Sequence, residues 1–427
     1  MSDIVVVGGG FAGVWAAAAA ARLLAGRRPG GTEHTVRLVT PEDDLVIRPR
    51  LYEADPHTMR VPLDRILAPA GVRRTAAAVT AIDTGQGALT AVDRAGRSRE
   101  IPYGRLVLAT GSRLVRPAVT GAEHLHDVDT LAGATALDAH LHALAELPAA
   151  GPGRWTAVVV GSGPTGLEVA TELTRRLRAV AAPHGAAGRV RVVLVERAGT
   201  VGAALGPSAA PVIAGALRGL GIETRAGVTV TGLAADAVVL SDGSRLLART
   251  AVWTAGFEAA EPARLIPGRH DGTGRLEVDA FLRVTGVPGV WAAGDAATAP
   301  TGDGHRTVPS CQYAIPLGKL AGHNAAAGLL GVEPEPFAPG PYVTCLDLGD
   351  AGALYTTGRE RAVHLTGDEA KKYKRAITEQ WIYPPLDDAA ELLRQADHRV
   401  RTRRSAPVPA APAESAGRSV RHDGAPS

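Results

Sequence analysis

Glycines near the start of the chain have the spacing that lets a backbone turn hold a pyrophosphate. Gly8, Gly10 and Gly13 follow the apolar run Ile4–Val7 and open an Ala-rich segment that reaches about Ala25. The first glycine permits a tight turn, the second lets backbone approach a phosphate, and the third lets helix and strand pack closely. The helix that begins there offers unpaired N–H groups to the phosphates. This context favours a dinucleotide site over an ordinary glycine-rich turn.

The same pattern recurs 153 residues later (161 − 8). Gly161, Gly163 and Gly166 follow a strand-like run at 157–160 and precede a helix that we expect over 167–180. Strands that alternate with helices predict parallel sheets, and the long period indicates a duplicated architecture rather than a short repeat.

An acid ends the strand that follows the second turn. Glu196 comes directly after the apolar run 191–195, where a carboxylate can accept both hydrogen bonds of an adenine ribose diol. It lies 30 residues after Gly166 (196 − 166), more than the usual spacing of about 20, and the loop 183–188 absorbs the excess. A carboxylate here favours NADH, while the neighbouring Arg197 leaves NADPH open. A solvated strand end is the alternative interpretation of Glu196.

The first unit departs from this pattern. Its second strand, expected at 35–39, ends at Thr40 rather than at an acid. A threonine hydroxyl can make one hydrogen bond to a ribose hydroxyl, and Glu42 or Asp43 remains a candidate for a further contact.

Four motifs in order carry a resemblance to the two-dinucleotide-binding-domain flavoproteins over roughly residues 1–330. They are GGGFAG at 8–13, LVLATGS at 106–112, VVVGSGPTGLEVA at 158–170 and VWAAGDAA at 290–297. The resemblance implies that the first glycine unit binds FAD and the second binds NAD(P)H. It also implies that Asp295 lies near the flavin ribityl and pyrophosphate, and that the turn 109–111 lines the FAD site.

Further segments resemble the type II NADH dehydrogenases (NADH:quinone oxidoreductases). GPTGLE resembles that family's second motif and implies that Glu168 lies beside the nicotinamide. The alternative interpretation is that the Glu168 carboxylate only stabilises the start of the helix. The run 48–53 resembles the family's Pro-Leu-Leu-Tyr segment near the flavin. In this run, Arg48 is expected to contact the FAD phosphate or the edge of the flavin. The alternative is an arginine at the protein surface with no such role.

The run 311–314 resembles the same family's Ala-Gln-x-Ala quinone-site motif, with Gly318 and Asn324 also in register. It implies an acceptor-side role for Gln312, which is otherwise an ordinary helix-start residue. Cys311 stands where the family has alanine, and Arg50 where it has leucine. Both departures concern the acceptor more than the flavin.

These arguments give a set of predicted site residues. The catalytic candidates are Glu168 and Gln312. The FAD contacts are Gly8, Gly10, Phe11, Ala12, Gly13, Thr40, Arg48, Val79, Thr110, Gly111, Asp295 and Gln312. The NAD(P)H contacts are Gly161, Gly163, Pro164, Thr165, Gly166, Glu168, Glu196, Arg197 and Gly256.

The predicted fold class is α/β, with two Rossmann-like dinucleotide-binding domains (FAD and NAD(P)H) and a smaller C-terminal α+β region. We expect the FAD-binding domain in residues 1–150 and 257–330, and the NAD(P)H-binding domain in 151–256. The C-terminal domain covers 331–404. Residues 405–427 have the composition of a disordered tail.

Cysteines and histidines argue against other chemistry. Cys311 and Cys345 are the only two cysteines in 427 residues and form no Cys-x-x-Cys pair, which disfavours disulfide reductases. The pairs His124/His126 and His140/His142 have i,i+2 spacing, which puts side chains on different faces of a helix. We therefore predict solvated histidines and no metal site.

The charge distribution bears on partners. The net charge of +3 reflects a basic tail, because residues 399–427 hold six arginines against two acids, about +4, and leave the body about −1. Nucleic-acid binding is not expected. No apolar run reaches the ~20 residues of a membrane span, and the first residues lack a signal-peptide pattern. We expect a cytoplasmic protein, with a homodimer left open.

A membrane contact at the inner face stays an open alternative. Apolar residues recur at helical spacing over 386–400, beside arginines. A helix packed on its own C-terminal domain explains the same pattern.

The sequence predicts an FAD-dependent NAD(P)H oxidoreductase that passes hydride from NADH to FAD and then electrons to a quinone-like acceptor. Two further enzymes remain open, a tailoring flavoenzyme for a small metabolite and a ferredoxin reductase, although the near-neutral body lacks a basic docking surface. The non-enzymatic alternative is an NADH-binding redox sensor.

Overall fold

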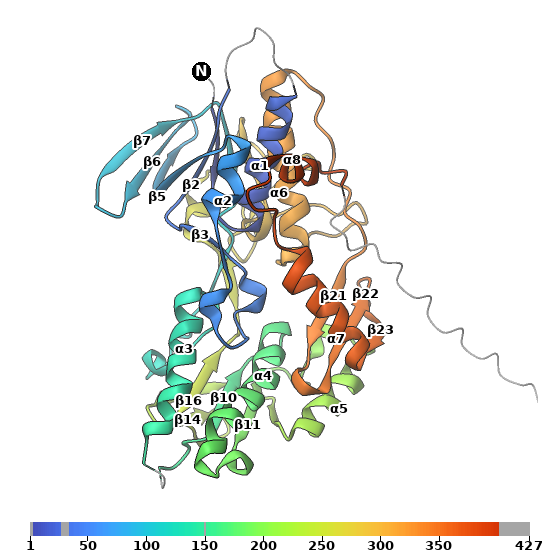
Figure 1. Cartoon of the computed structure of the whole chain (residues 1–427). Helices are drawn as coiled ribbons and strands as arrows, with labels where there is room; N and C mark the ends of the chain where they lie inside the picture. The colour runs from blue at the N-terminus through green and yellow to red at the C-terminus, as the bar shows by residue number, and fades with distance from the viewer. Residues whose placement is uncertain (1–2, 27–33, 149–150, 401–427) are drawn as a thin grey trace, which may run out of the picture.

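The computed structural model describes residues 3–26, 34–148 and 151–400. Its first sheet has the strand order β19-β8-β1-β2-β5-β6-β7. The first five of these strands run parallel, and β5, β6 and β7 pair antiparallel (Figure 1). All four residues of β1 are buried, as expected of a parallel strand covered on both faces. The bounds are β1 Ile4–Val7, β2 Val36–Thr40, β5 Arg73–Asp83, β6 Ala88–Asp93, β7 Ser98–Pro102, β8 Arg105–Leu108 and β19 Val290–Ala292.

Two helices pack very closely on one another beside this sheet. They are α1 (Phe11–Ala25) and α6 (Cys311–Leu330), and they lie side by side in Figure 1. A Cβ on Gly318 would lie 2.3 Å from the carbonyl oxygen of Ala12, and one on Gly322 would lie 2.0 Å from that of Ala16. Glycine is therefore required at both positions of α6 for the helix backbones to meet.

Helix α6 begins earlier than its sequence suggests. Proline inside a helix removes a backbone hydrogen bond, so the sequence favours a helix only after Pro316, but α6 starts at Cys311 with Pro316 inside it. The hydroxyl of Ser310 caps the start by accepting a hydrogen bond from the Tyr313 N–H at 3.3 Å. Helix α4 (Pro164–Ala181) likewise starts before the expected Leu167, because proline is well suited to the first helical position.

The second sheet repeats the arrangement on a smaller scale. Its strand order is β12-β11-β10-β16, all parallel, and α3, α4 and α5 belong to the same lobe. A three-stranded antiparallel sheet, β13-β14-β15, lies in this lobe too. The bounds are α3 Leu131–Ala143, β10 Thr156–Val160, β11 Arg191–Glu196, α5 Ala210–Leu220, β12 Glu223–Ala226, β13 Val230–Ala234, β14 Ala237–Leu240, β15 Arg245–Leu247 and β16 Thr250–Trp253.

Short elements connect the two halves. The pair β9 (Ser112–Leu114) and β17 (Phe257–Ala259) joins antiparallel, so the chain leaving the first half meets the chain leaving the second. The remaining short elements pair or pack elsewhere: β3 Asp44–Val46 pairs with β4 Arg60–Pro62, β18 Leu276–Glu277 pairs with β20 Ala297–Thr298, and α2 Leu63–Leu67 packs against α1.

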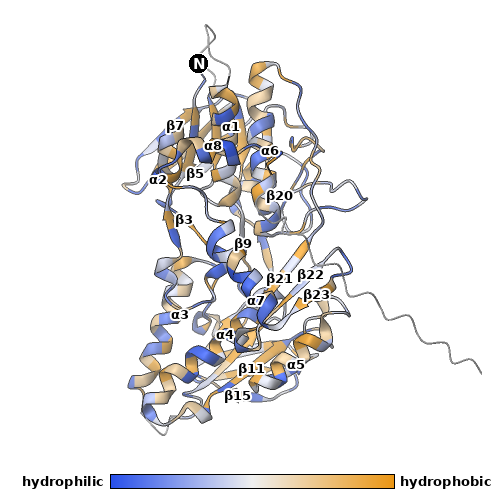
Figure 2. Cartoon of the chain, turned by 45° about the vertical axis from the view of Figure 1, so that its right-hand side comes forward, coloured by the Kyte–Doolittle hydropathy of each residue, from blue (hydrophilic) through white to orange (hydrophobic). Residues whose placement is uncertain are grey.

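The C-terminal region is a three-stranded antiparallel sheet followed by helices, which agrees with the predicted α+β character. Its elements are β21 Val343–Asp347, β22 Ala353–Thr357, β23 Ala362–Thr366, α7 Gly367–Ala376, a π-helical turn Ile377–Trp381 and α8 Ala389–Gln395. Figure 2 shows hydrophobic colour along β11 of the core and hydrophilic colour on much of α7.

The amphipathic segment expected over 386–400 forms only the short helix α8. Helix α8 packs against α1 and α2 and buries Leu392; Ala396, directly after it, is also buried, while Leu386 before it is exposed. None of the described helices is both long and apolar enough to cross a bilayer. Contact with a membrane surface stays a prediction, and the tail expected at 405–427 lies outside the described residues.

The prediction of solvated histidines is wrong for His126 and His140. Their ring centroids lie 4.3 Å apart with the planes tilted by 36°, and His140 Nε2 lies 3.0 Å from the hydroxyl of Thr250. The backbone of His126 forms a bridge with Val252 at the edge of β16. Burial, and secondarily the neighbouring His140, lowers the pKa of His126 to about 4. Helical spacing could not reveal this, because His126 is not in a helix and tertiary contact joins the two rings.

Candidate active site

A cleft of about 850 Å³ lies between the two halves of the molecule. It is lined by the first glycine turn, the ends of β2 and β8 and the segment around Asp295, and on the other side by the start of α4 and the end of β16. The carboxyl ends of parallel strands are where open α/β sheets bind ligands. The predicted residues that line it are Gly8, Gly10, Phe11, Ala12, Thr40, Arg48, Val79, Thr110, Gly111, Thr165, Glu168, Gly256 and Asp295.

The first glycine turn has the geometry that its spacing predicts. Gly8 has φ +110°, and a Cβ there would lie 2.3 Å from the Ala109 carbonyl oxygen. A Cβ on Gly13 would lie 1.8 Å from the Gly8 carbonyl oxygen, which explains the close packing of α1 on β1. Gly13 itself therefore lies behind the cleft. A Cβ on Gly10 would meet no protein atom within 4 Å, so this position leaves room for a ligand.

Helix α1 begins at this turn without a side-chain cap. Its first N–H groups are therefore available to an anion at the helix N-terminus. Thr110 adds a second polar group, because its buried hydroxyl lines the cleft and has no hydrogen-bond partner among the described residues. An orphaned donor beside an open glycine turn fits a ligand rich in phosphate and hydroxyl oxygens, such as FAD.

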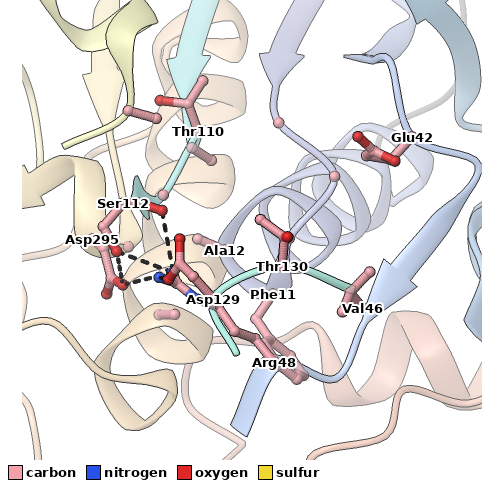
Figure 3. Close-up of a pocket in the computed structure, with 18 of the residues that line it drawn as sticks. Phe11, Ala12, Glu42, Val46, Arg48, Thr110, Ser112, Asp129, Thr130 and Asp295 are labelled. Carbon is pink, nitrogen blue, oxygen red and sulfur yellow. Dashed lines mark hydrogen bonds and ion pairs between the residues drawn. The ribbon is translucent and has the colours of Figure 1, made fainter. Parts of the chain in front are cut away.

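A polar network holds Asp295 at the cleft. Ser112 donates its hydroxyl hydrogen bond to Asp295 Oδ2 at 2.9 Å, and the Ser310 N–H donates to Oδ1 at 3.0 Å. Arg48 forms an ion pair with Asp129, donates to the Ser112 hydroxyl at 3.1 Å and lies 3.9 Å from Asp295. Figure 3 shows the side chains of Arg48, Ser112, Asp129 and Asp295 turned toward one another. Arg48 is thus part of the site and not an isolated surface arginine.

The two acids after Thr40 have different surroundings. Glu42 lines the cleft, on the side opposite Asp295 in Figure 3. Asp43 instead forms ion pairs with Arg74 and Arg94, and the hydrogen bond from Arg94 leads in lowering its pKa. Of the two candidates left open by the sequence, only Glu42 lines this cleft.

The second glycine turn repeats the first but lies outside the lining of this cleft. Gly161 has φ +101°, and a Cβ on Gly166 would lie 1.8 Å from the Gly161 carbonyl oxygen. Gly163, the N-cap of α4, faces open space, and Pro164 is the first residue of the helix. Among the predicted nucleotide contacts of this half, Thr165, Glu168 and Gly256 reach the cleft.

Glu196 lies beside the second turn. Its Oε2 accepts hydrogen bonds from the Ser162 N–H at 2.8 Å and hydroxyl at 2.6 Å, and its Oε1 accepts one from the Ala198 N–H at 2.8 Å. Burial acts to raise the pKa of this carboxyl, but these hydrogen bonds together lower it. Glu196 is therefore an ionised carboxylate held at the turn. Its neighbour Arg197 is exposed.

Glu168 forms a buried ion pair that the sequence did not predict. Lys374 of α7 donates to its Oε1 at 2.7 Å, and the Asp347 N–H donates to the same oxygen at 3.1 Å. Burial raises the pKa of the Glu168 carboxyl, against the opposing effect of the Lys374 ammonium. Tyr52 lies next to the pair and donates its hydroxyl hydrogen bond to Asp347 Oδ2 at 3.2 Å. The C-terminal region thus holds the Glu168 side chain from behind, and none of its described residues lines the cleft itself.

Gln312 is not among the residues that line the cleft, although its neighbour Cys311 is. Its Nε2 donates to the Pro341 carbonyl at 3.2 Å, and its Oε1 accepts from the Val343 N–H at 3.1 Å. Both ends of the amide therefore hold the segment that leads into β21. Arg50 pairs with Glu53, and no disulfide joins Cys311 to Cys345.

Lys374 and Asp129 are two residues of the site that the sequence does not reveal. Lys374 lies 206 residues from Glu168 (374 − 168), on a helix with charged neighbours, so no local signal marks it. Asp129 precedes helix α3, and nothing in its surroundings distinguishes it from a capping residue.

Comparison with known proteins identifies the family. The model for pyridine nucleotide-disulphide oxidoreductases matches residues 2–318. The chain belongs to this family. The assignment confirms the flavoprotein superfamily and the α/β fold predicted from the four motifs, and membership implies binding of FAD and a pyridine nucleotide.

Individual relatives refine this picture. An NADH dehydrogenase-like protein of Mycobacterium tuberculosis is 46% identical over 406 residues, covering 94% of this chain and 100% of the relative. A demethylphylloquinone reductase of Synechocystis is 26% identical over 405 residues, covering 90% and 96%. The structure of NDH2 from Plasmodium falciparum in complex with NADH has a TM-score of 0.74 at 12% identity, covering 90% and 95%. The chain is an NADH dehydrogenase-like oxidoreductase of its family.

Proposed function

We propose that the protein is an FAD-dependent NADH oxidoreductase that passes electrons to a quinone-like acceptor. The observation that carries the proposal is the shared cleft. The turn suited to FAD and the residues at the start of α4 line one cavity, so a flavin and a nicotinamide have room to meet there. The names of relatives that act on quinones support the acceptor class.

On the FAD side, the chain supplies backbone and fixed polar groups. Gly10 and the N-terminus of α1 would hold the pyrophosphate, the Thr110 hydroxyl would donate to the cofactor, and Asp295 would accept from the ribityl hydroxyls. Glu42 or Thr40 would contact the adenosine ribose. When bound, FAD supplies the redox chemistry, since its ring accepts a hydride and returns electrons to a second acceptor.

On the nucleotide side, Glu196 would read the ribose diol. Its negative charge repels a 2′-phosphate, which favours NADH over NADPH. Gly163 leaves space for the pyrophosphate at the second turn. Arg197 is exposed and free of any ion pair with a described residue, so NADPH is retained as a weaker substrate.

Glu168 would position the nicotinamide. Its two contacts, with Lys374 and the Asp347 N–H, both engage Oε1, so Oε2 is without a hydrogen bond to a described residue, and Glu168 lines the cleft. A carboxylate oxygen there can accept a hydrogen bond from the carboxamide N–H. Gln312 has an indirect part in this proposal, because it holds residues 341–343 beside Cys311 at the acceptor end of the cleft.

Stopped-flow absorbance of the purified, anaerobic protein tests the proposal. We expect NADH to bleach the flavin rapidly and a water-soluble quinone to restore its absorbance rapidly. Bleaching without recovery by quinone would reject the acceptor and favour a tailoring enzyme or a redox sensor. A protein that neither contains nor takes up flavin would reject the proposal as a whole.

A further inference from the structure

Two histidines and a glutamate meet on the α6 side of the molecule, away from the cleft. They are His323 of α6, Glu335 of the segment after α6 and His398 beyond α8. One ligand atom from each lies within 4.8 Å of the other two. In the described part of the chain, no other three or more His, Cys, Asp or Glu side chains converge in this way. None of the three lines the cofactor cleft.

The distances are close to those of a metal site. His398 Nε2 lies 2.8 Å from Glu335 Oε2, and the centroids of the two histidine rings are 4.4 Å apart. Bonds of about 2.1 Å to one metal ion place neighbouring ligand atoms roughly 3 Å to 3.5 Å apart. Small side-chain shifts would therefore bring the three donors to a single ion.

His323 has no hydrogen bond to explain its position. The residue is 7% exposed, and neither ring nitrogen hydrogen-bonds to a described residue. In the same cluster, Nδ1 of His398 is buried and has no hydrogen-bond partner among the described residues. A buried imidazole nitrogen without a partner loses the hydrogen bond that it would make to water. A metal ion bound to one ring nitrogen would compensate for that loss.

The supports behind the three side chains are firm. Asn324, next to His323, accepts a hydrogen bond from the Glu335 N–H at 2.9 Å and donates to the Glu335 carbonyl at 2.8 Å. Asp397, next to His398, forms an ion pair with Arg22 of α1. Backbone on both sides of the cluster is thus fixed by polar contacts that do not use the ligand atoms.

Three cationic side chains lie around the cluster, and each contacts an oxygen atom that is not one of the proposed ligand atoms. Arg399 pairs with Glu335, through Oε1 rather than the Oε2 that faces His398. Arg22 pairs with Asp397, and Lys319 donates to the Val400 carbonyl at 3.2 Å. A carboxylate that binds an ion through one oxygen and an arginine through the other is a common arrangement around metal ligands.

We propose that His323, Glu335 and His398 form a binding site for a divalent first-row transition metal ion such as zinc. Two imidazoles and one carboxylate suit such an ion and not Mg²⁺, which prefers oxygen ligands. The ion would join α6, the segment after it and the residues beyond α8, and so fasten the end of the described chain to the FAD-side helices. The prediction of no metal site was based on the spacing of the pairs His124/His126 and His140/His142. His323 and His398 lie 75 residues apart (398 − 323), so no local spacing joins them.

Zinc titration of the full chain tests the site. The protein is stripped with a chelator and titrated with Zn²⁺ against a chromogenic competitor, and the melting temperature is followed with and without zinc. We expect one equivalent to bind, and binding to weaken by roughly 100-fold or more in H323A, H398A and E335Q, since even residues behind the ligands change affinity 10- to 100-fold. Mg²⁺ should neither compete nor raise the melting temperature.

Two matched variants control for the loss of a histidine or a carboxylate. H57A removes an exposed histidine and E333Q an exposed neighbour of Glu335, and both should bind zinc like the wild type. E335Q and H398A keep the test decisive if H323A fails to fold. No stoichiometric zinc binding, or equal binding by wild type, E335Q and H398A, would overturn the proposal. Flavin reduction by NADH should be unchanged in stripped protein, so the outcome is independent of the proposed function.

Discussion

The two glycine turns have nearly the same backbone geometry. Their first glycines have φ +110° and +101°, and a Cβ on the third glycine would lie 1.8 Å from the carbonyl oxygen of the first in both. The second glycine in each faces open space. Both halves therefore keep the backbone that a pyrophosphate requires, although the side chains around them have diverged.

The helices that start at these turns are covered in different ways. The seventh residue after the first glycine is Trp15 in one half (15 − 8) and Glu168 in the other (168 − 161). A lysine from a later helix covers each, since Lys319 Nζ lies 4.6 Å from the Trp15 ring centroid and Lys374 pairs with Glu168 at 2.7 Å. The first helix carries an aromatic ring under a lysine, and the second carries a buried ion pair whose Glu168 lines the cleft.

Replacing the two lysines by methionine should separate these roles most strongly. K374M leaves the buried Glu168 without its partner, so we expect a loss of about 3–5 kcal/mol in unfolding free energy. K319M removes a cation–π contact and should cost about 1–2 kcal/mol. Urea unfolding measures both.

K372M, at an exposed lysine of the same helix as Lys374, is the control and should unfold like the wild type. The double variant E168Q/K374M should recover most of the loss, because no charge remains buried. A K374M protein as stable as K372M would mean that the ion pair contributes nothing to the closure of the second half.

Alanine at the second glycine of each turn should separate the two ligands. G10A and G163A place a Cβ in open space at φ −78° and −67°, so neither should strain the fold. We expect G10A to weaken FAD retention and G163A to weaken NADH binding, each roughly 10- to 100-fold, because the added methyl occupies ligand space. Flavin content after gel filtration and the NADH dependence of flavin reduction measure the two effects.

Gly215 is an exposed glycine of α5, and a Cβ there also faces open space. G215A therefore controls for the added methyl group. Equal loss of both ligands in G10A and G163A would contradict the assignment of one ligand to each turn.

The parts that sequence predicted well depend on short stretches of chain. The turns at 8–13 and 161–166, and the strand before each, follow from glycine spacing and apolar runs of four residues. Contacts between distant segments had no such signal. The resemblance implied Glu168 beside the nicotinamide, but nothing in the sequence predicted its ion pair with Lys374. The position of Gln312 depends on hydrogen bonds to backbone near 341–343, which lies outside its motif.

The acids that follow the second strand offer a smaller contrast. E196Q removes the charge that Ser162 and Ala198 hold in place, so we expect the kcat/KM ratio of NADH to NADPH to fall about 10-fold, equivalent to about 1.4 kcal/mol. E42Q in the first half should change flavin retention less than threefold, since Glu42 is not held by a comparable set of hydrogen bonds. Steady-state kinetics with both nucleotides, and flavin content, measure the two effects. An unchanged nucleotide ratio in E196Q would remove Glu196 from the nucleotide site.

The smallest expected difference lies at the sheet edges. In the first half β8 pairs with the strand β19, whereas in the second half the corresponding edge of β16 is met by a bridge at His126. Burial, together with His140 and Arg116 and against Asp127, lowers the pKa of His126 to about 4, below the ~6.5 of the unfolded chain. The unfolded state therefore takes up this proton first as pH falls. The stability that His126 contributes is complete above about pH 6.5 and is lost toward pH 4.

We expect the free energy of unfolding of the wild type to fall by about 1 kcal/mol more than that of H126Q between pH 7 and pH 5, after allowance for partial exposure of the ring. Urea unfolding at a series of pH values measures the difference. H124Q, at an exposed histidine two residues away, should follow the wild type. If wild type and H126Q lost stability in parallel, the proton-sensitive edge would have to be sought at His140, whose pKa burial also lowers.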